Sequence, residues 1–222
     1  MAAQARTDRS DGLHLVEADG GKVIISQVEA VVRDIGLDLP DGETCEGLEL
    51  ESPVRCDEDG DKLIIEGPFE LDLMTATARP SLSDVSIPAG TYRRVDLRID
   101  ADGDAALRLV GEMPADQGST PVELALPVSE DARFEHPDGI AVGDGSSLLA
   151  LLDLDVLLGE VSLQRCIHED HADRTSVGVF IDGSSCDDVV DAVEEVLKER
   201  WDLVDGSGPS EAPEDDGPED HD

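Results

Sequence analysis

The chain has 222 residues and carries 54 Asp and Glu against 16 Lys and Arg, which gives a formal net charge of −38. Such a surface repels nucleic acids and anionic membranes, so we expect no nucleic-acid partner. No apolar run approaches the ~18 residues of a transmembrane helix, so we also expect no membrane span.

The surplus of acid comes with only three lysines, a combination typical of proteins adapted to high salt. Because the Debye length falls from ~10 Å at 0.1 M salt to ~3 Å at 1 M, self-repulsion should matter in dilute buffer and largely vanish in molar salt. An intrinsically disordered acidic chain is the rival interpretation. Alternating apolar segments disfavour it for everything except the C-terminal tail.

Residues 1–11 contain charged side chains and no apolar stretch, so we expect a flexible N-terminus without a signal peptide. Residues 12–182 are expected to form a β-domain. Its first segment, 22–39, is ambiguous: β-branched residues favour strand. The alternative is a helix, because Ser26-Gln27-Val28-Glu29 is a capping box.

Further strands follow at intervals typical of β-proteins. Leu63–Ile65 and Phe69–Leu73 flank Gly67-Pro68, which we expect to break the strand or make a bulge. Residues 91–99 alternate apolar and polar side chains along a strand. The remaining expected strands are 106–110, 122–128, 147–153 and 177–181. Short strands with frequent Gly, Pro and Asp turns predict a mainly β fold, an antiparallel sandwich.

Residues 183–204 show helical periodicity and are expected to form a C-terminal amphipathic helix that packs on the β-domain. Its apolar stripe is Val189, Val193, Val196, Leu197, Trp201 and Val204. The alternative use of this stripe is dimerisation or binding of a partner. Residues 205–222 hold eight acidic residues and no Lys or Arg, which predicts a disordered acidic tail.

Two segments resemble a known family. Gly67-Pro68-Phe69-Glu70-Leu71-Asp72-Leu73-Met74 and the later run Ile87–Ile99, with its Pro-Ala-Gly-Thr-Tyr, are similar to uncharacterised prokaryotic envelope proteins. These are mostly predicted lipoproteins with a β-sandwich domain of unknown function. The resemblance covers about residues 12–165 and implies an extracytoplasmic, non-enzymatic sandwich of immunoglobulin- or transthyretin-like type, without catalytic residues. The chain departs from the family in lacking a lipid-attachment Cys.

Four cysteines allow three pairings. The spacing favours two disulfides, Cys45–Cys56 and Cys166–Cys186, in an oxidising compartment. The alternative is four reduced thiols in a cytoplasmic protein.

Two loops share the form Asp-x-Asp-Gly-Asp, and alternating carboxylates around a glycine turn can wrap Ca²⁺. The candidate ligands are Asp57, Asp59, Asp61, Asp100, Asp102 and Asp104. Plain hairpin turns are the competing interpretation, because Asp and Gly favour turns. We expect no other cofactor.

Two groups of polar residues could either bind a ligand or be ordinary surface residues. Cys166–Asp173 gathers zinc-type ligands, His168 and His171 among them, but a solvated polar loop is favoured. Several arginines on neighbouring strands could hold an anionic ligand, although cross-strand pairing with carboxylates is favoured. They are Arg93, Arg94, Arg98 and Arg108.

No nucleophile elbow, P-loop or complete dinucleotide fingerprint occurs in the sequence. The sequence therefore predicts a non-catalytic, salt-adapted envelope or surface module with a binding or scaffolding role toward an unknown partner. A calcium-dependent binding module is the first alternative. The second is an unrecognised hydrolase with a pocket around His168 or His136.

Overall fold

The computed structural model is mainly β and describes most of the chain. The described residues are 2–5, 13–16, 21–102, 105–115, 118–143, 148–152, 157, 159, 161, 163–168, 173–175, 178–184, 186–199 and 201–205. Within them, strands form one large sheet and one small sheet, and helices are few.

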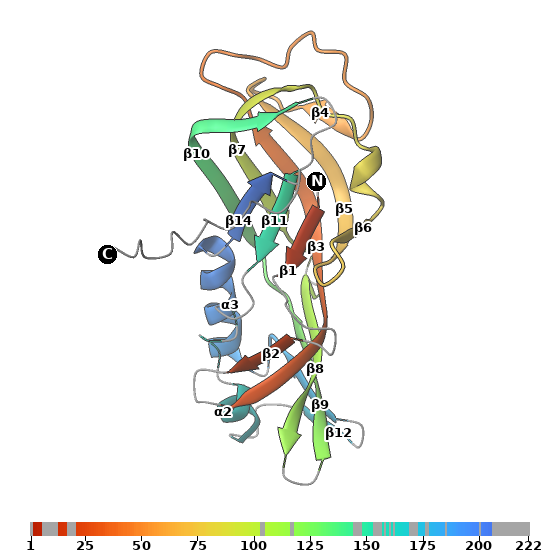
Figure 1. The fold of residues 1–222 in the computed structure, drawn as a ribbon, viewed down its shortest axis with the longest axis vertical. Helices are drawn as coiled ribbons and strands as arrows, with labels where there is room; N and C mark the ends of the chain where they lie inside the picture. Colours follow the sequence, from red (N-terminus) through yellow and green to blue (C-terminus); the bar gives the residue numbers. More distant parts are fainter. Residues whose placement is uncertain are drawn as a thin grey trace, which may run out of the picture.

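The large sheet contains eleven of the described strands (Figure 1). They are β2 (Leu13–Val16), β3 (Lys22–Asp38), β4 (Val54–Cys56), β5 (Lys62–Asp72), β6 (Thr77–Arg79), β7 (Gly90–Ile99), β8 (Leu107–Ala115), β9 (Gly118–Leu126), β10 (Glu130–Val142), β12 (Asp173–Thr175) and β13 (Gly178–Asp182). The small sheet holds β1 (Ala2–Ala5), β11 (Leu148–Leu152) and β14 (Trp201–Asp205). The helices are a 3₁₀ turn (Leu82–Asp84), α2 (Leu163–His168) and α3 (Asp187–Glu199).

Strand β3 is the central element, and it resolves the ambiguity of residues 22–39 in favour of strand. Its first half pairs with β2 and β8, and its second half pairs with β5 and β7. Val23, Ile25, Val28, Ala30 and Val32 are all buried along it. The helical alternative is wrong because four neighbouring strands satisfy the backbone of β3 and its β-branched side chains fit a pleated sheet.

The pairing of β3 with its neighbours shifts register at two places, and a glycine on the neighbouring strand accompanies each shift. The pairing with β5 shifts between Val32 and Asp34, and there Gly67 lies so close that a Cβ would sit 2.6 Å from the carbonyl oxygen of Arg33. The pairing with β8 shifts between Ile25 and Gln27. At Gly111 a Cβ would lie 2.4 Å from the carbonyl oxygen of Ile24. Gly67-Pro68 therefore makes a bulge inside a continuous β5.

The small sheet lies against the part of the large sheet that β3 shares with β5 and β7. Strand β14 contacts β10, while β1 contacts β5 and β6 (Figure 1). Two strand pairs are parallel, β1 with β11 and β9 with β13, so the expectation of a purely antiparallel arrangement is wrong. Residues 2–5, expected in a flexible N-terminus, form β1.

The expected helix of residues 183–204 is shorter in the structure. Helix α3 spans Asp187–Glu199, contacts β10, and buries Val189, Val193, Val196 and Leu197. Residues 201–205 form β14 instead, because pairing with the apolar strand β11 satisfies their backbone hydrogen bonds. The acidic tail after residue 205 lies outside the described residues.

The core lies on the inner side of the large sheet, where alternate residues of every long strand are buried. Phe69 and Tyr92 are its largest fully buried side chains. The Tyr92 hydroxyl donates a hydrogen bond of 2.6 Å to the carbonyl oxygen of Pro88, which satisfies its polar group. Among the residues that the structure describes, no helix is both long and apolar enough to span a membrane.

Candidate functional site

Both expected disulfides are present. Cys45–Cys56 ties the loop after β3 to the end of β4, with 5.7 Å between the Cα atoms. Cys166–Cys186 joins α2 to the residue before α3, with a Cα separation of 6.1 Å. Two disulfides in a chain of this size are consistent with an oxidising, extracytoplasmic environment.

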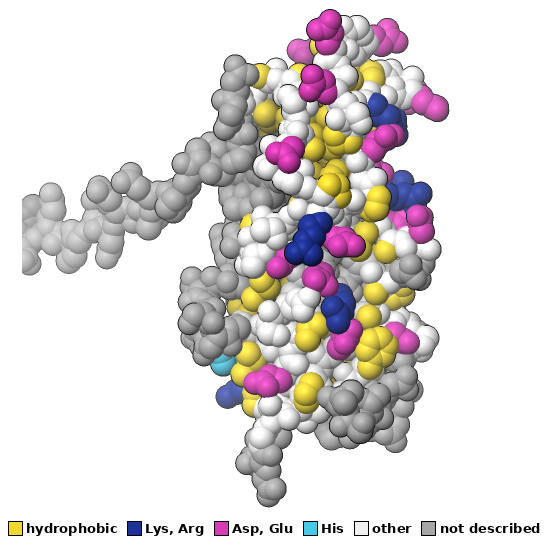
Figure 2. All heavy atoms as spheres, turned by 90° about the vertical axis from the view of Figure 1, so that its right-hand side faces the viewer, with side chains coloured by type: hydrophobic (Ala, Val, Ile, Leu, Met, Phe, Trp, Pro, Cys, Tyr) yellow, Lys and Arg dark blue, Asp and Glu magenta, His cyan; other side chains and the backbone are white. Residues whose placement is uncertain are grey.

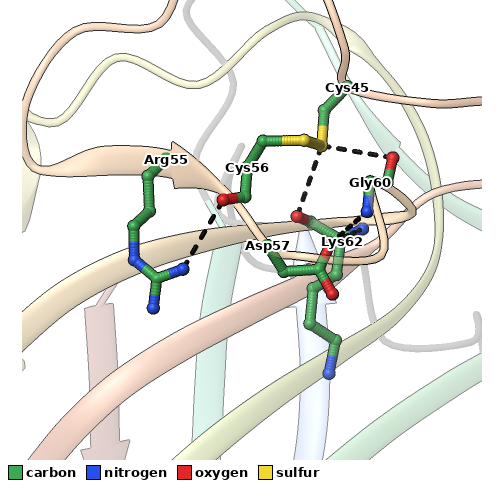
Figure 3. Close-up of a disulfide and its surroundings, with 6 residues drawn as sticks. All are labelled: Cys45, Arg55, Cys56, Asp57, Gly60 and Lys62. Carbon is green, nitrogen blue, oxygen red and sulfur yellow. Dashed lines mark hydrogen bonds between the residues drawn. A yellow bond between two sulfur atoms is a disulfide. The ribbon is translucent and has the colours of Figure 1, made fainter.

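The loop beyond Cys56 is a turn organised by one carboxylate. Asp57 accepts hydrogen bonds from the backbone N–H groups of Gly60 and Lys62, at 2.8 and 3.2 Å (Figure 3). The Cys45 sulfur lies 3.3 Å from the Gly60 carbonyl oxygen. A disulfide sulfur has no hydrogen to donate, so this is a packing contact.

The first calcium candidate is Asp57 with Asp59 and Asp61. In the structure, carboxylate oxygens of these three residues do not all lie within 4.8 Å of one another. Among the described residues, the one group of at least three ligand atoms within 4.8 Å of one another is Cys45, Cys56 and Asp57. Its two sulfurs form the disulfide and are not thiolates. Asp57 therefore acts as a turn-forming residue here, and calcium binding by this loop stays a prediction.

In the second candidate loop, the Arg33 guanidinium occupies the neighbourhood of the carboxylates. Its Nη1 lies 3.1 Å from Asp100 and 2.5 Å from Asp102. Asp100 also accepts a 2.9 Å hydrogen bond from the Asp102 backbone N–H. Asp104 lies outside the described residues, so this calcium site also stays a prediction.

These contacts hold both partners in their charged forms. The Asp102 backbone hydrogen bond, together with Arg33, lowers the pKa of Asp100 below its ordinary value. The hydrogen bond to Asp100 and the charge of Asp102 raise the pKa of Arg33.

A charge network crosses three adjacent strands at the end of β3. Asp38 pairs in register with Lys62 of β5 and with Arg94 of β7. The Lys62 Nζ lies 3.0 Å from Asp38 and 2.7 Å from Asp96. Arg94 lies 2.9 Å from each of the same two carboxylates.

The Lys62 side chain runs across β3 at a glycine. Gly36 stands between Ile64 and Asp96 in the sheet register. A Cβ on Gly36 would lie 3.2 Å from both the Cδ and the Nζ of Lys62. The lysine therefore crosses β3 over Gly36 to reach Asp96.

Asp38 is the one buried charged side chain among the described residues, at 4 % exposed. Burial by itself raises its pKa, but hydrogen bonds from Lys62 and Arg93 outweigh burial and the pKa is lowered. Burial also opposes the charge of Lys62, yet Asp96 and Asp38 raise the pKa of that lysine. Both groups therefore stay ionised around neutral pH.

The four singled-out arginines all lie near carboxylates: Arg93, Arg94 and Arg108 pair across strands, as the favoured interpretation predicted, while Arg98 pairs with Asp100 of its own segment. Arg93 lies 3.2 Å from Asp38 and Arg98 lies 4.0 Å from Asp100. Arg108 lies 2.8 Å from Glu123 and 3.3 Å from Glu29. Figure 2 shows the general pattern on the side of the molecule that carries β5 and β6: basic side chains lie beside acidic ones, with hydrophobic side chains between them.

The side of the large sheet that carries this network is hereafter the outer face. Residues directly opposite in the register share a face. The outer face comprises Asp34, Gly36 and Asp38 of β3, Lys62, Ile64 and Glu66 of β5, and Arg94, Asp96 and Arg98 of β7.

Two adjoining cavities hollow the outer face. The larger, about 590 Å³, is lined by residues of β3, β4 and β5 and by residues just after β7. The second, about 450 Å³, extends toward Lys62 and Asp96. Asp34, Arg55 and Ile64 line both. At the rim, the Arg55 Nε donates a 2.5 Å hydrogen bond to Glu66.

The sequence pointed to the arginines of β7 and β8 as candidate ligand-binding residues. It did not indicate that Asp34, Asp38, Lys62 and Arg55 lie on one surface. Lys62 carried a signal, since it is one of three lysines in the chain and begins a strand. The solvated polar loop expected over Cys166–Asp173 is wrong for its first residues, because Cys166 and Ile167 are buried in helix α2, while residues 169–172 lie outside the described residues. His171 lies outside the described residues, as do the side chains of His136 and His168.

Comparisons with known proteins give no significant match for the chain. No family model matches it, and neither a curated protein nor a solved structure is significantly similar to it.

Proposed function

We propose that the chain is a non-catalytic, salt-adapted binding or scaffolding module of the cell envelope, and that it binds through the outer face. The observation that carries this proposal is the pair of adjoining cavities, which share Asp34, Arg55 and Ile64. Binding sites are usually concave and hold a few oriented polar groups. Here Asp34 and Arg55 are such groups, and they lie beside the apolar Ile64.

The electrostatics of the outer face support recognition over acid–base chemistry. A general acid or base works best when its pKa lies near the operating pH. The pKa of Asp100 and that of Asp38 are lowered, while the pKa of Lys62 is raised. Each shift moves the group away from neutrality and keeps its charge fixed, which suits an ionic contact to a ligand.

The disulfides support the envelope location, because such bonds persist in oxidising compartments. A cytoplasmic location is the alternative. The finer part of the proposal is a sandwich of immunoglobulin- or transthyretin-like type, with the small sheet as its second layer. Contacts of β14 with β10 and of β1 with β5 and β6 support this layering.

A capture experiment tests the proposal. The purified chain and a variant carrying Arg33→Glu and Arg55→Glu, two exposed residues that line the larger cavity, would be used to capture partners from extracts of the source cells, with isotope labels for quantification. We expect one defined partner to be retained by the parent chain and lost by the variant. A matched variant, Arg165→Glu with Lys198→Glu, changes exposed bases away from the outer face and should retain the partner.

The same preparation would be assayed on a panel of ester, peptide and glycoside substrates. If the highly purified chain still converts one of these substrates, the non-catalytic part of the proposal is contradicted. Retention of the same partner by both variants would contradict the assignment of the outer face.

A further inference from the structure

We propose that the larger cavity binds a small zwitterion with an aliphatic body, of the α-amino acid class. This inference rests on the proposed function and names the ligand class of the same site. The cavity volume of about 590 Å³ lies within the roughly 300–1,000 Å³ typical of small-molecule sites.

The apolar part of the lining matches an aliphatic body. It consists of Val31, Ile64, Pro68, Ala101 and Ala105. No aromatic side chain is among the described residues that line the cavity, so a sugar ring or nucleobase finds no surface for stacking.

Two guanidinium groups provide donors for a carboxylate. Arg33 makes its two ion pairs through Nη1 alone, and Arg55 uses Nε toward Glu66 and Nη1 toward the Cys56 carbonyl oxygen. Each guanidinium has five N–H donors, so further N–H groups remain for a ligand.

Two of the three acidic partners of these arginines compete weakly with a ligand, while Asp100, whose side chain is 12 % exposed, keeps its ion pair with Arg33. The Asp102 side chain is 77 % exposed and that of Glu66 is 58 % exposed. Exposed ion pairs contribute little stability, so a ligand carboxylate held by two N–H groups can replace one of them.

Asp34 provides the acceptor for an ammonium group. It lines the cavity, and among the described residues no Lys or Arg nitrogen lies within 4.0 Å of its carboxylate. Arg98 stands opposite Asp34 in the register, but the ion pair of Arg98 is with Asp100. The cavity therefore offers donors for one end of a zwitterion and an acceptor for the other.

The whole-molecule charge favours the same ligand class. A net charge of −38 repels a free anion, and it attracts a simple cation to any of the many surface carboxylates. A zwitterion has no net charge, so the electrostatic field of the whole molecule does not repel it and does not draw it to other surface carboxylates. Binding then depends on the local arrangement of Arg33, Arg55 and Asp34.

Isothermal titration calorimetry on the full chain in molar NaCl tests this inference with three probes of one shape. L-leucine has both charges, N-acetyl-L-leucine only the carboxylate, and L-leucine methyl ester only the ammonium. We expect L-leucine to bind and each derivative to bind about tenfold more weakly or worse, because each lacks one charged hydrogen-bonding group.

Variants then locate the site. Arg55→Gln and Asp34→Asn should each weaken L-leucine binding about tenfold. Arg133→Gln, a change on β10 outside the cavity, should leave it unchanged. Thermal melts of each variant establish that the fold is retained.

Equal affinity for the three probes, or no heat from any of them, would overturn the amino-acid assignment. If partner capture by the outer face persisted in that case, the proposed function would stand with another ligand. Loss of capture as well would remove both.

Discussion

Asp38 is the residue on which the charge network of the outer face depends. It is 4 % exposed and lies within 3.2 Å of Lys62, Arg93 and Arg94. Removing one member of a buried ionic cluster leaves the others uncompensated in a poorly solvated place. Loss of one member of the network should therefore destabilise the chain where β5, β3 and β7 pair.

We expect Asp38→Asn to lower the free energy of unfolding by about 3 kcal/mol at neutral pH. Urea denaturation followed by circular dichroism measures this. Asp41→Asn is the matched control, because its side chain is 91 % exposed and pairs with Arg93 only at the surface. It should change stability by less than about 0.5 kcal/mol.

The stability difference between the parent chain and Asp38→Asn should depend on pH. The folded pKa of Asp38 is lowered, so its contribution is complete above the unfolded pKa of about 3.9 and is lost as pH falls through the folded pKa. The stability difference between the parent chain and Asp38→Asn should be constant from about pH 5 to 8 and shrink below about pH 4. A difference that shrinks instead between pH 6 and 8 would contradict the charged network.

At the scale of single residues, the sequence predicted that the arginines pair with carboxylates. It did not predict that these ion pairs share partners and form one network. Alternation along residues 91–99 placed Arg94, Asp96 and Arg98 on one face. Their partners Asp38 and Lys62 come from strands whose order in the sheet no local pattern encodes. The disulfides were predictable because short spacing limits the pairings, and they are confirmed.

The disulfide that anchors the loop to β4 gives a test of its own. Replacing both Cys45 and Cys56 by Ser opens a loop of 11-residue separation, and we expect a loss of about 3 kcal/mol. Urea denaturation of the double variant against the parent chain measures it. Mass spectrometry after alkylation without reductant should find no free thiol in the parent chain, and four alkylated cysteines would contradict both bonds.

At the scale of elements, β3 determines the architecture because its two halves serve different neighbours. The two register shifts allow this, and each depends on a missing Cβ on the adjacent strand, at Gly67 and Gly111. Sequence reasoning anticipated the first from Gly67-Pro68. The second gave no signal, since an isolated glycine inside a strand is compatible with several roles.

We expect Gly67→Ala and Gly111→Ala each to destabilise the chain by about 2–3 kcal/mol, because a Cβ would meet backbone carbonyl oxygens of β3. Gly90→Ala is the matched control. Gly90 begins β7 with nothing within 4 Å of its would-be Cβ, so this change should be neutral or slightly stabilising. Similar losses at all three glycines would show that the close approaches do not matter.

The C-terminal helix illustrates why element boundaries escape sequence reasoning. Trp201 and Val204 continue the helical spacing of α3, yet they belong to β14. The partner strand β11 lies about 50 residues earlier, so its influence cannot be recognised from a local window. The parallel pairs β1–β11 and β9–β13 were missed for the same reason.

At the scale of the whole molecule, the net charge of −38 sets how stability responds to salt. We expect the melting temperature to rise steeply between 0.1 and 1 M NaCl, because the Debye length falls from ~10 to ~3 Å. CaCl₂ at matched ionic strength separates screening from binding. Added stability at sub-millimolar Ca²⁺ that NaCl cannot reproduce would establish a site that binds the native state. Asp57 and Asp100 would then be the first residues to mutate.

The proposed function places binding on the hollowed outer face of the large sheet. Site-specific photo-crosslinking in the source cells tests it most directly, with a benzophenone side chain at Glu58 or Ala101, which line the two cavities, and at Thr120 as an exposed control on β9. We expect one defined adduct to form from positions 58 and 101 and not from position 120. Adducts that form equally at all three positions, or only at position 120, would contradict it.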